Sequence, residues 1–131
     1  MKRRTAREKA LQALFQIDVS DTEPSLAIEH VLEGETGDDY LNQLVLGVVE
    51  QKEEIDALIS ENLEKWSLDR LATVDRNLLR MAAFELKFSQ DIPDNVILDE
   101  AIEIAKIYGD DQSSKFINGV LSNIKEKLHN D

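Results

Sequence analysis

Apolar residues recur along this chain with the spacing of α-helices from one end to the other. In the clearest stripe, Ile97, Ala101, Ile104, Ala105 and Tyr108 share one face of a helix. Comparable stripes begin near residues 6, 26, 41, 55, 74 and 116, and β-type alternation is nearly absent. Only two prolines and five glycines interrupt the pattern. It predicts an all-α bundle of six or seven helices with short connections.

Several residues indicate where these helices begin, end or meet a neighbour. Pro24 suits the first turn of a helix, and Gly109 suits the position just after one. The stripe from Ile55 to Trp66 continues the preceding helix with a bend or forms another. Gly119 lies inside the last stripe, where glycine is unfavourable, and this usually indicates close packing of another backbone.

Composition restricts the class of protein further. At 131 residues, the chain fits one domain spanning 1–131, and the absence of cysteine is consistent with a reducing cytoplasm. The longest apolar run is residues 44–49, too short for a membrane span. Neither a phosphate-binding glycine motif nor a paired-histidine motif is present. We therefore expect no enzyme, cofactor, metal or small-molecule substrate.

The distribution of charge is uneven. The chain carries −12, yet residues 1–9 carry about +4, which leaves −16 on the remainder. The cations of this basic segment are Lys2, Arg3, Arg4, Arg7 and Lys9. Near a helix N-terminus such cations are mildly unfavourable, and unpaired guanidinium groups do not enter a core. The pattern predicts that the first turns extend past the body, as a phosphate-binding arm over residues 1–7 or as a frayed, solubilising end.

Two further stretches combine charge with apolar residues. In "TVDRNLLRMAAFEL" (73–86), we expect Arg76, Arg80 and Glu85 to form structural ion pairs or capping contacts. In "GDDQSSKFINGVL" (109–121), the periodicity places Phe116 in the core. Because Lys115 precedes it near a helix start, the ring could instead stack on a nucleotide base.

Together these stretches resemble the NusB family of transcription antitermination factors. The resemblance is carried by "RRTAREKALQALF", "DRNLLRMAAFEL" and "DEAIEIAKIYGDDQSSKFINGVL" and runs from Arg3 to about Ile124. It implies a fold of two packed helical subdomains and a role in assembling an antitermination complex on ribosomal RNA transcripts. The implied ligand is single-stranded boxA-type RNA, bound together with the ribosomal protein NusE. NusA, NusG and RNA polymerase are the further implied partners.

Carried over residue by residue, the resemblance predicts two groups of RNA-binding residues. The arginine-rich group is Lys2, Arg3, Arg4 and Arg7, and the C-terminal group is Gln112, Lys115 and Phe116. It also suggests Phe15 and Asp75 as partner contacts.

Two other interpretations remain open from the sequence. The chain could be an acidic, helical protein-interaction scaffold whose basic start only aids solubility. It could also be an accessory module of an RNA methyltransferase, which would require a separate catalytic chain.

Overall fold

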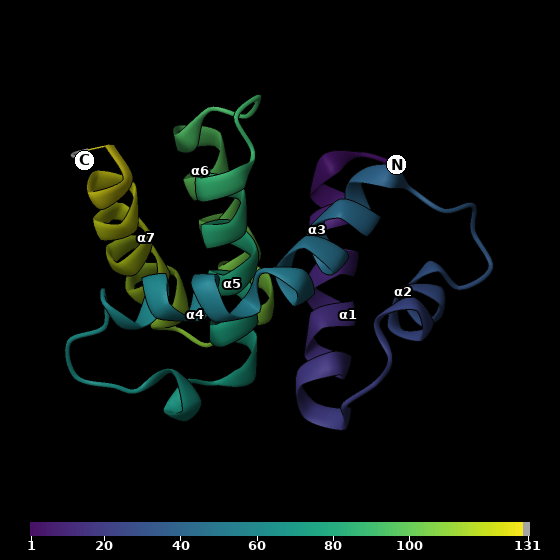
Figure 1. Ribbon diagram of the computed structural model, residues 1–131, viewed down its shortest axis with the longest axis horizontal. Helices are drawn as coiled ribbons and strands as arrows, with labels where there is room; N and C mark the ends of the chain where they lie inside the picture. Colours follow the sequence, from purple (N-terminus) through teal and green to yellow (C-terminus); the bar gives the residue numbers. More distant parts are fainter. Residues whose placement is uncertain (130–131) are drawn as a thin grey trace.

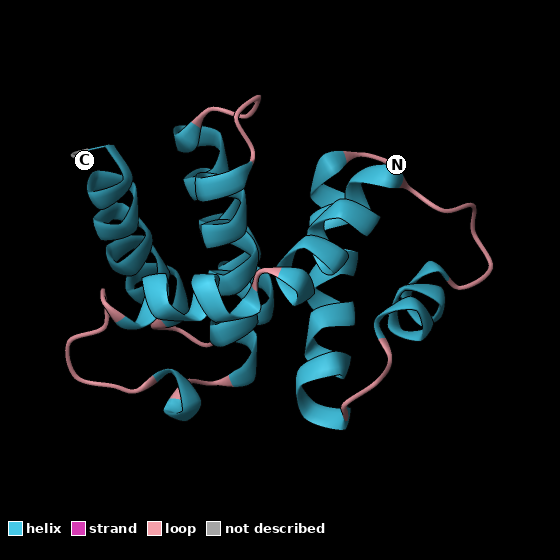
Figure 2. Ribbon diagram, viewed as in Figure 1, coloured by secondary structure: helices cyan, strands magenta, loops and turns pink. Residues whose placement is uncertain are grey.

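Helices follow one another along the chain in the computed structural model, which describes residues 1–129, and no strand lies among those residues (Figure 2). The helices are α1 (Arg3–Ser20), α2 (Pro24–Leu32), α3 (Asp39–Glu50), α4 (Lys52–Ser60), α5 (Thr73–Phe88), α6 (Asp94–Tyr108) and α7 (Ser113–His129), with a short 3₁₀ helix at Leu68–Arg70. The predicted all-α class is confirmed.

Local chemistry fixes several helix starts. Pro24 occupies the first turn of α2, as predicted, and the Glu23 carboxylate accepts a hydrogen bond from the Leu26 amide at 3.1 Å. At α3, the Asp38 carboxylate accepts the Leu41 amide hydrogen at 3.0 Å. These side chains satisfy amide groups that have no partner within the first turn of a helix.

The helices form two packed groups, α1–α3 and α4–α7 (Figure 1). Helix α5 joins the groups because it packs against α1 and α3 as well as α4, α6 and α7. The largest fully buried side chains come from both groups: Leu41, Leu44, Ile55, Ile59, Leu78, Leu79, Met81, Ile97, Ile104, Ile117, Leu121 and Ile124. One continuous core thus underlies both helical subdomains.

Two glycines within helices have opposite surroundings. A Cβ atom at Gly47 of α3 would lie 2.3 Å from the Phe84 ring of α5, so glycine allows these two helices to approach closely. A Cβ atom at Gly119 of α7 would meet no described protein atom within 4 Å apart from its chain neighbours and the adjacent backbone of α7. The expectation that Gly119 marks close packing of another backbone is therefore wrong for contacts inside this chain.

The predicted structural ion pairs of α5 are present. Arg80 donates through Nε to Asp56 Oδ1 at 2.8 Å, and Arg76 donates through Nε to Asp18 Oδ2 at 2.8 Å. These pairs connect α5 to α4 and to the C-terminal half of α1. Among residues 1–129, no helix has both the length and the hydropathy needed to span a membrane.

Candidate nucleic-acid interface

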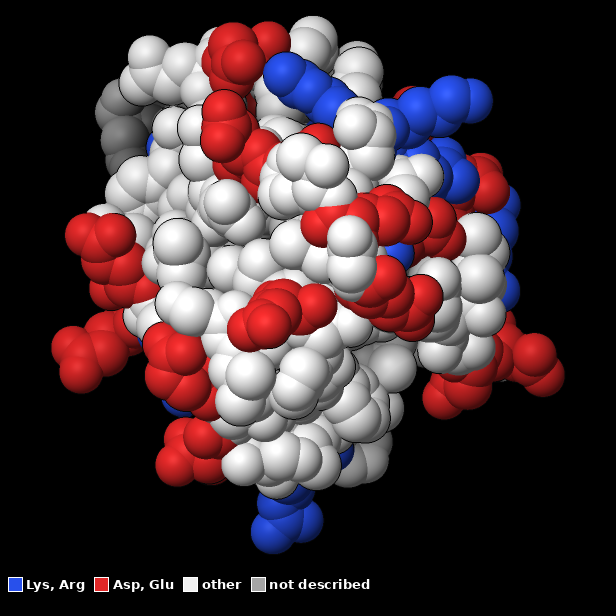
Figure 3. Space-filling view, turned by 90° about the vertical axis from the view of Figure 1, so that its right-hand side faces the viewer, with Lys and Arg blue, Asp and Glu red and all other residues white. Residues whose placement is uncertain are grey.

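The N-terminal basic segment is helical from Arg3 onward, and Lys2 is its capping residue. The first turn contains no acidic residue that could offset the helix dipole. The side chain of Arg3 is 55% exposed, and that of Arg4 is 38% exposed. Figure 3 shows Lys and Arg gathered near the top of one face, the end at which α1 begins in Figure 1, among many Asp and Glu side chains.

Arg7 differs from the other cations of the segment because it lies inside the protein. Its side chain is 3% exposed, and its guanidinium donates from Nε and Nη2 to the two carboxylate oxygens of Glu85, at 2.8 and 3.1 Å. The predicted overhang of the first turns is thus wrong at Arg7. A guanidinium enters the core when a carboxylate pairs with it, and Glu85 is 78 residues away in the sequence. The direct partner of Arg7 in this structure is therefore the Glu85 carboxylate, and a direct contact from Arg7 to RNA stays a prediction.

Tyr40 links this buried pair to the exposed cations. Its hydroxyl donates a hydrogen bond to Glu85, and the Arg3 guanidinium lies 4.8 Å from the centre of its ring. Burial raises the pKa of Tyr40, and the Glu85 carboxylate raises it further, so the hydroxyl stays protonated as a donor. Tyr40 therefore offers a flat surface that fixes the position of Arg3.

The exposure of the Arg4 side chain is intermediate between that of buried Arg7 and that of exposed Arg3. Arg4 forms two hydrogen bonds with Glu100 of α6, the one from Nη2 to Oε1 measuring 3.0 Å. The hydrogen bond from Arg4 lowers the pKa of Glu100 despite partial burial. An RNA phosphate would have to compete with this carboxylate for Arg4. Lys2 is exposed, and Arg3 lies 3.9 Å from the carboxylate of Asp91, a pair in which both side chains are largely exposed to solvent.

The C-terminal group of predicted residues lies at the start of α7. Gln112 and Lys115 are exposed, while Phe116 is half-buried and packs against the core. Phe116 and Trp66 together line two neighbouring hollows, of about 470 and 340 Å³. The burial expected from periodicity is thus partly met at Phe116, and stacking on a base stays a prediction for the part of the ring that faces the hollows.

The smaller hollow contains Asp75, which was predicted as a partner contact. Its side chain faces the same hollow as Gln112 and Phe116, and the residue is 9% exposed. Its Oδ1 atom accepts no hydrogen bond within residues 1–129. Burial raises the pKa of Asp75. A side-chain hydrogen bond with Ser113 opposes this rise, and the nearby Asp110 carboxylate adds to it.

Trp66 was not predicted as a site residue. The helical pattern suggested that it continues the stripe from Ile55, but α4 ends at Ser60 and Trp66 is 57% exposed. The sequence feature that could have indicated an exposed aromatic residue is "EKWS", in which Trp66 stands between charged and small polar residues.

Phe15, the other predicted partner contact, lies on a different surface. It is exposed on α1 together with Val19, one helical turn further on. The same side of α1 borders the end of α6, where Tyr108 lies close to Glu8 and Gln12. This exposed α1 face is partly apolar and carries acidic groups at its edge.

The structure separates the two groups of predicted RNA-binding residues. Helix α1 begins at the upper end of the view in Figure 1, and α7 begins at its lower end. Gln112, Phe116 and Asp75 come together around Trp66, while Lys2, Arg3 and Arg4 lie at the other end. A single ligand that contacts both groups must therefore extend along the bundle. Within the described residues, no group of three or more metal-binding side chains is assembled.

The family model and a highly similar curated relative indicate the same family for this chain. A model of the NusB family matches residues 4–126. The transcription antitermination protein NusB of Bacillus licheniformis is 62% identical over 128 residues, covering 98% of this chain and 99% of the relative.

Solved structures are similar over nearly the whole chain. NusB of T. maritima superimposes with a TM-score of 0.89 at 45% identity, covering 97% of this chain and 92% of the other. A structure of the antitermination factors NusB and NusE in complex with double-stranded RNA gives a TM-score of 0.87 at 33% identity, with 95% and 96% covered.

Proposed function

This chain belongs to the NusB family, and we propose that it acts in the cytoplasm as a transcription antitermination factor that binds boxA-type single-stranded RNA of ribosomal RNA transcripts. The observation that carries the proposal is the pair of separated sites on a chain of charge −12. One site presents Lys2 and Arg3 to solvent, and the other presents Lys115, Phe116 and Trp66.

The N-terminal site supplies contacts to phosphates. Guanidinium groups have forked donors that match phosphate oxygens, and each neutralised phosphate releases counterions. Such contacts give affinity and position the strand, but they carry little sequence information. In this proposal Lys2, Arg3 and, in part, Arg4 make them, while Arg7 acts as a positioning residue.

The C-terminal site supplies contacts to bases. The exposed part of the Phe116 ring can stack on an unpaired base, and the amide of Gln112 can both donate and accept hydrogen bonds at a base edge. Stacking of this kind requires bases that are not already stacked in a duplex. The geometry therefore favours a single-stranded ligand.

A basic ribosomal protein of the NusE type is the partner in this proposal. The acidic body attracts a basic chain, and the exposed α1 face of Phe15 and Val19 offers apolar surface for contact. The structure solved for a relative holds NusB with NusE and double-stranded RNA. NusA, NusG and RNA polymerase complete the proposed assembly, in which this chain has no catalytic role.

A binding titration tests the proposal. A labelled boxA-type RNA is titrated with the protein, with and without NusE, against a scrambled single strand and a duplex of the same length. We expect weak binding alone and tighter binding with NusE, with the boxA-type strand preferred. Equal affinity for all three RNAs in both conditions would contradict the proposal. Binding of NusE combined with no binding of any of the three RNAs would support the scaffold interpretation.

A further inference from the structure

Gly119 faces the larger hollow at a point where the fold itself does not need glycine. It lies within α7, a position where glycine weakens a helix relative to alanine. Apart from its chain neighbours and the adjacent backbone of α7, no described protein atom lies within 4 Å of the position that a Cβ atom would occupy there. The space is therefore left open toward the hollow that Gly119 lines.

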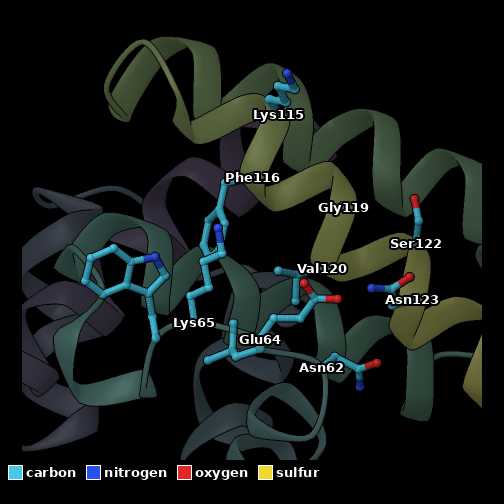
Figure 4. Close-up of a pocket in the computed structure, with 11 residues that line it drawn as sticks. Asn62, Glu64, Lys65, Lys115, Phe116, Gly119, Val120, Ser122 and Asn123 are labelled. Atoms are coloured by element: carbon cyan, nitrogen blue, oxygen red, sulfur yellow. The ribbon is translucent and has the colours of Figure 1, made fainter.

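The walls of this hollow combine aromatic, cationic and amide groups. Trp66 and Phe116 supply rings, Lys65 and Lys115 supply positive charge, and Asn62 and Asn123 supply amides. Figure 4 shows Phe116 directed from α7 toward the segment that carries Glu64, while Lys115 points away to the outer side. At about 470 Å³, the hollow falls within the range of roughly 300–1,000 Å³ found for small-molecule sites.

We propose that this hollow is a nucleobase site, in which one base of the bound RNA lies against Trp66 and the open surface of Gly119. The inference rests on the proposed function and deepens it, because it assigns a place to a base beyond the contact at Phe116. A flat base approaches Gly119 closely because no side chain intervenes.

The charges of the hollow favour a nucleotide over a peptide of a basic partner. Glu64 is the one acid among the described residues that line it. Lys65 lies beside it and Lys115 stands at the outer side, although the whole chain carries −12. Lysines here attract the phosphates that flank a base and repel a basic peptide.

The amides give the site a means of discriminating between bases. The Asn62 side-chain nitrogen donates to the Leu58 carbonyl oxygen at 2.8 Å, which orients that amide. Asn123 is exposed, so its donor and acceptor are both free to meet a base edge.

The experiment uses the single tryptophan of the chain as its reporter. The full chain is titrated with a boxA-type single-stranded RNA while Trp66 fluorescence and RNA anisotropy are followed, and Trp66→Phe serves as the optical blank. We expect saturation to quench Trp66. Gly119→Leu, which fills the hollow without changing charge, should abolish the quenching and weaken binding about 5- to 150-fold, the range of one lost base-stacking contact.

Asn118→Leu is the matched control, because it adds the same side chain one position away on an exposed part of α7 that does not line the hollow. It should bind RNA as the unmodified chain does. If Gly119→Leu does not fold, Trp66→Ala replaces it, since an exposed side chain can be removed without loss of the core.

The outcomes separate the inference from the proposed function. Tight RNA binding without quenching of Trp66, or with unchanged affinity of Gly119→Leu, overturns the nucleobase site and leaves the proposed function intact. Absence of RNA binding even with NusE overturns both. If Gly119→Leu loses NusE but retains RNA, the hollow is a protein-docking site and the inference is wrong.

Discussion

Arg7 and Glu85 face each other in the interior through two parallel hydrogen bonds, of 2.8 and 3.1 Å, although 78 residues separate them in sequence. The pair joins α1 to α5, and Tyr40 adds a third hydrogen bond to the same carboxylate. Removing one partner of such a pair leaves an uncompensated charge in the interior.

We expect Glu85→Ala to lower the free energy of unfolding by about 3–5 kcal/mol, because it strands the Arg7 guanidinium in the core. Urea denaturation measures the change. Glu103→Ala is the control, since its pair with Lys106 lies on the surface, where such pairs contribute about 0–1 kcal/mol. Equal losses of unfolding free energy for the two substitutions would show that the buried pair contributes no more to stability than the surface pair.

Substitutions in the basic segment should distinguish the residues that bind RNA from the residue that stabilises the fold. Replacing Lys2 and Arg3 by alanine removes two exposed cations, so the slope of log K against log salt should become shallower by about 1.4 for single-stranded RNA. Thermal stability should stay nearly unchanged. Arg7→Ala should instead lower the melting temperature, and a salt slope unaffected by the double substitution would refute the phosphate-contact role.

Asp18 should make stability fall in acid. Burial works against its ionisation, but hydrogen bonds from Arg76 and Asn77 outweigh burial and hold the pKa of Asp18 below its ordinary value near 3.8. A carboxylate with a lowered pKa stabilises the fold above that ordinary value, and the contribution is lost as pH falls through the lower, folded-state pKa. Asp18→Asn should therefore destabilise the protein at pH 7 and much less near pH 2, as followed by urea denaturation. A difference that stays constant across this range would contradict the assignment.

Gly119→Ala should raise the free energy of unfolding by about 0.5–1 kcal/mol. The added methyl group meets no neighbour, so only the gain in helix propensity remains. Chemical denaturation of the isolated chain provides the measurement. A loss of stability would mean that another group occupies the space next to the Gly119 Cα atom.

Gly47→Ala should have the opposite sign and lower the free energy of unfolding by about 1–3 kcal/mol. Its methyl group would collide with the Phe84 ring, which stacks on Phe88 at 5.4 Å between centroids. The same substitution in a Phe84→Leu background should lower the free energy of unfolding less, because the smaller leucine side chain avoids the collision with the added methyl group. Equal costs in both backgrounds would exclude the collision as the cause.

The sequence predicts the helices well because each apolar stripe follows from spacing within a few turns. Ile97, Ala101, Ile104 and Ala105 share one face by periodicity, and all four are buried. Pro24 and the ion pairs of α5 were likewise accessible to local reasoning.

The sites were less predictable because they depend on partners distant in sequence. The helical position of Arg7 on the apolar stripe was visible, but Glu85 as the carboxylate that allows its burial was not. Trp66 follows the helical spacing by coincidence, since the helix ends before it. The open space at Gly119 could be recognised only after the neighbouring helices were placed.

The contacts of Tyr40 and Glu85 have a consequence for the thermodynamics of RNA binding. Because Arg7 anchors the second turn of α1 and Arg3 lies over the Tyr40 ring, the basic segment is already ordered before any ligand arrives. Binding at this end then loses little conformational entropy, unlike binding by a basic tail that folds on its target. In the proposed complex, the entropic penalty of association falls instead on the RNA, which has to extend along the bundle to contact both sites.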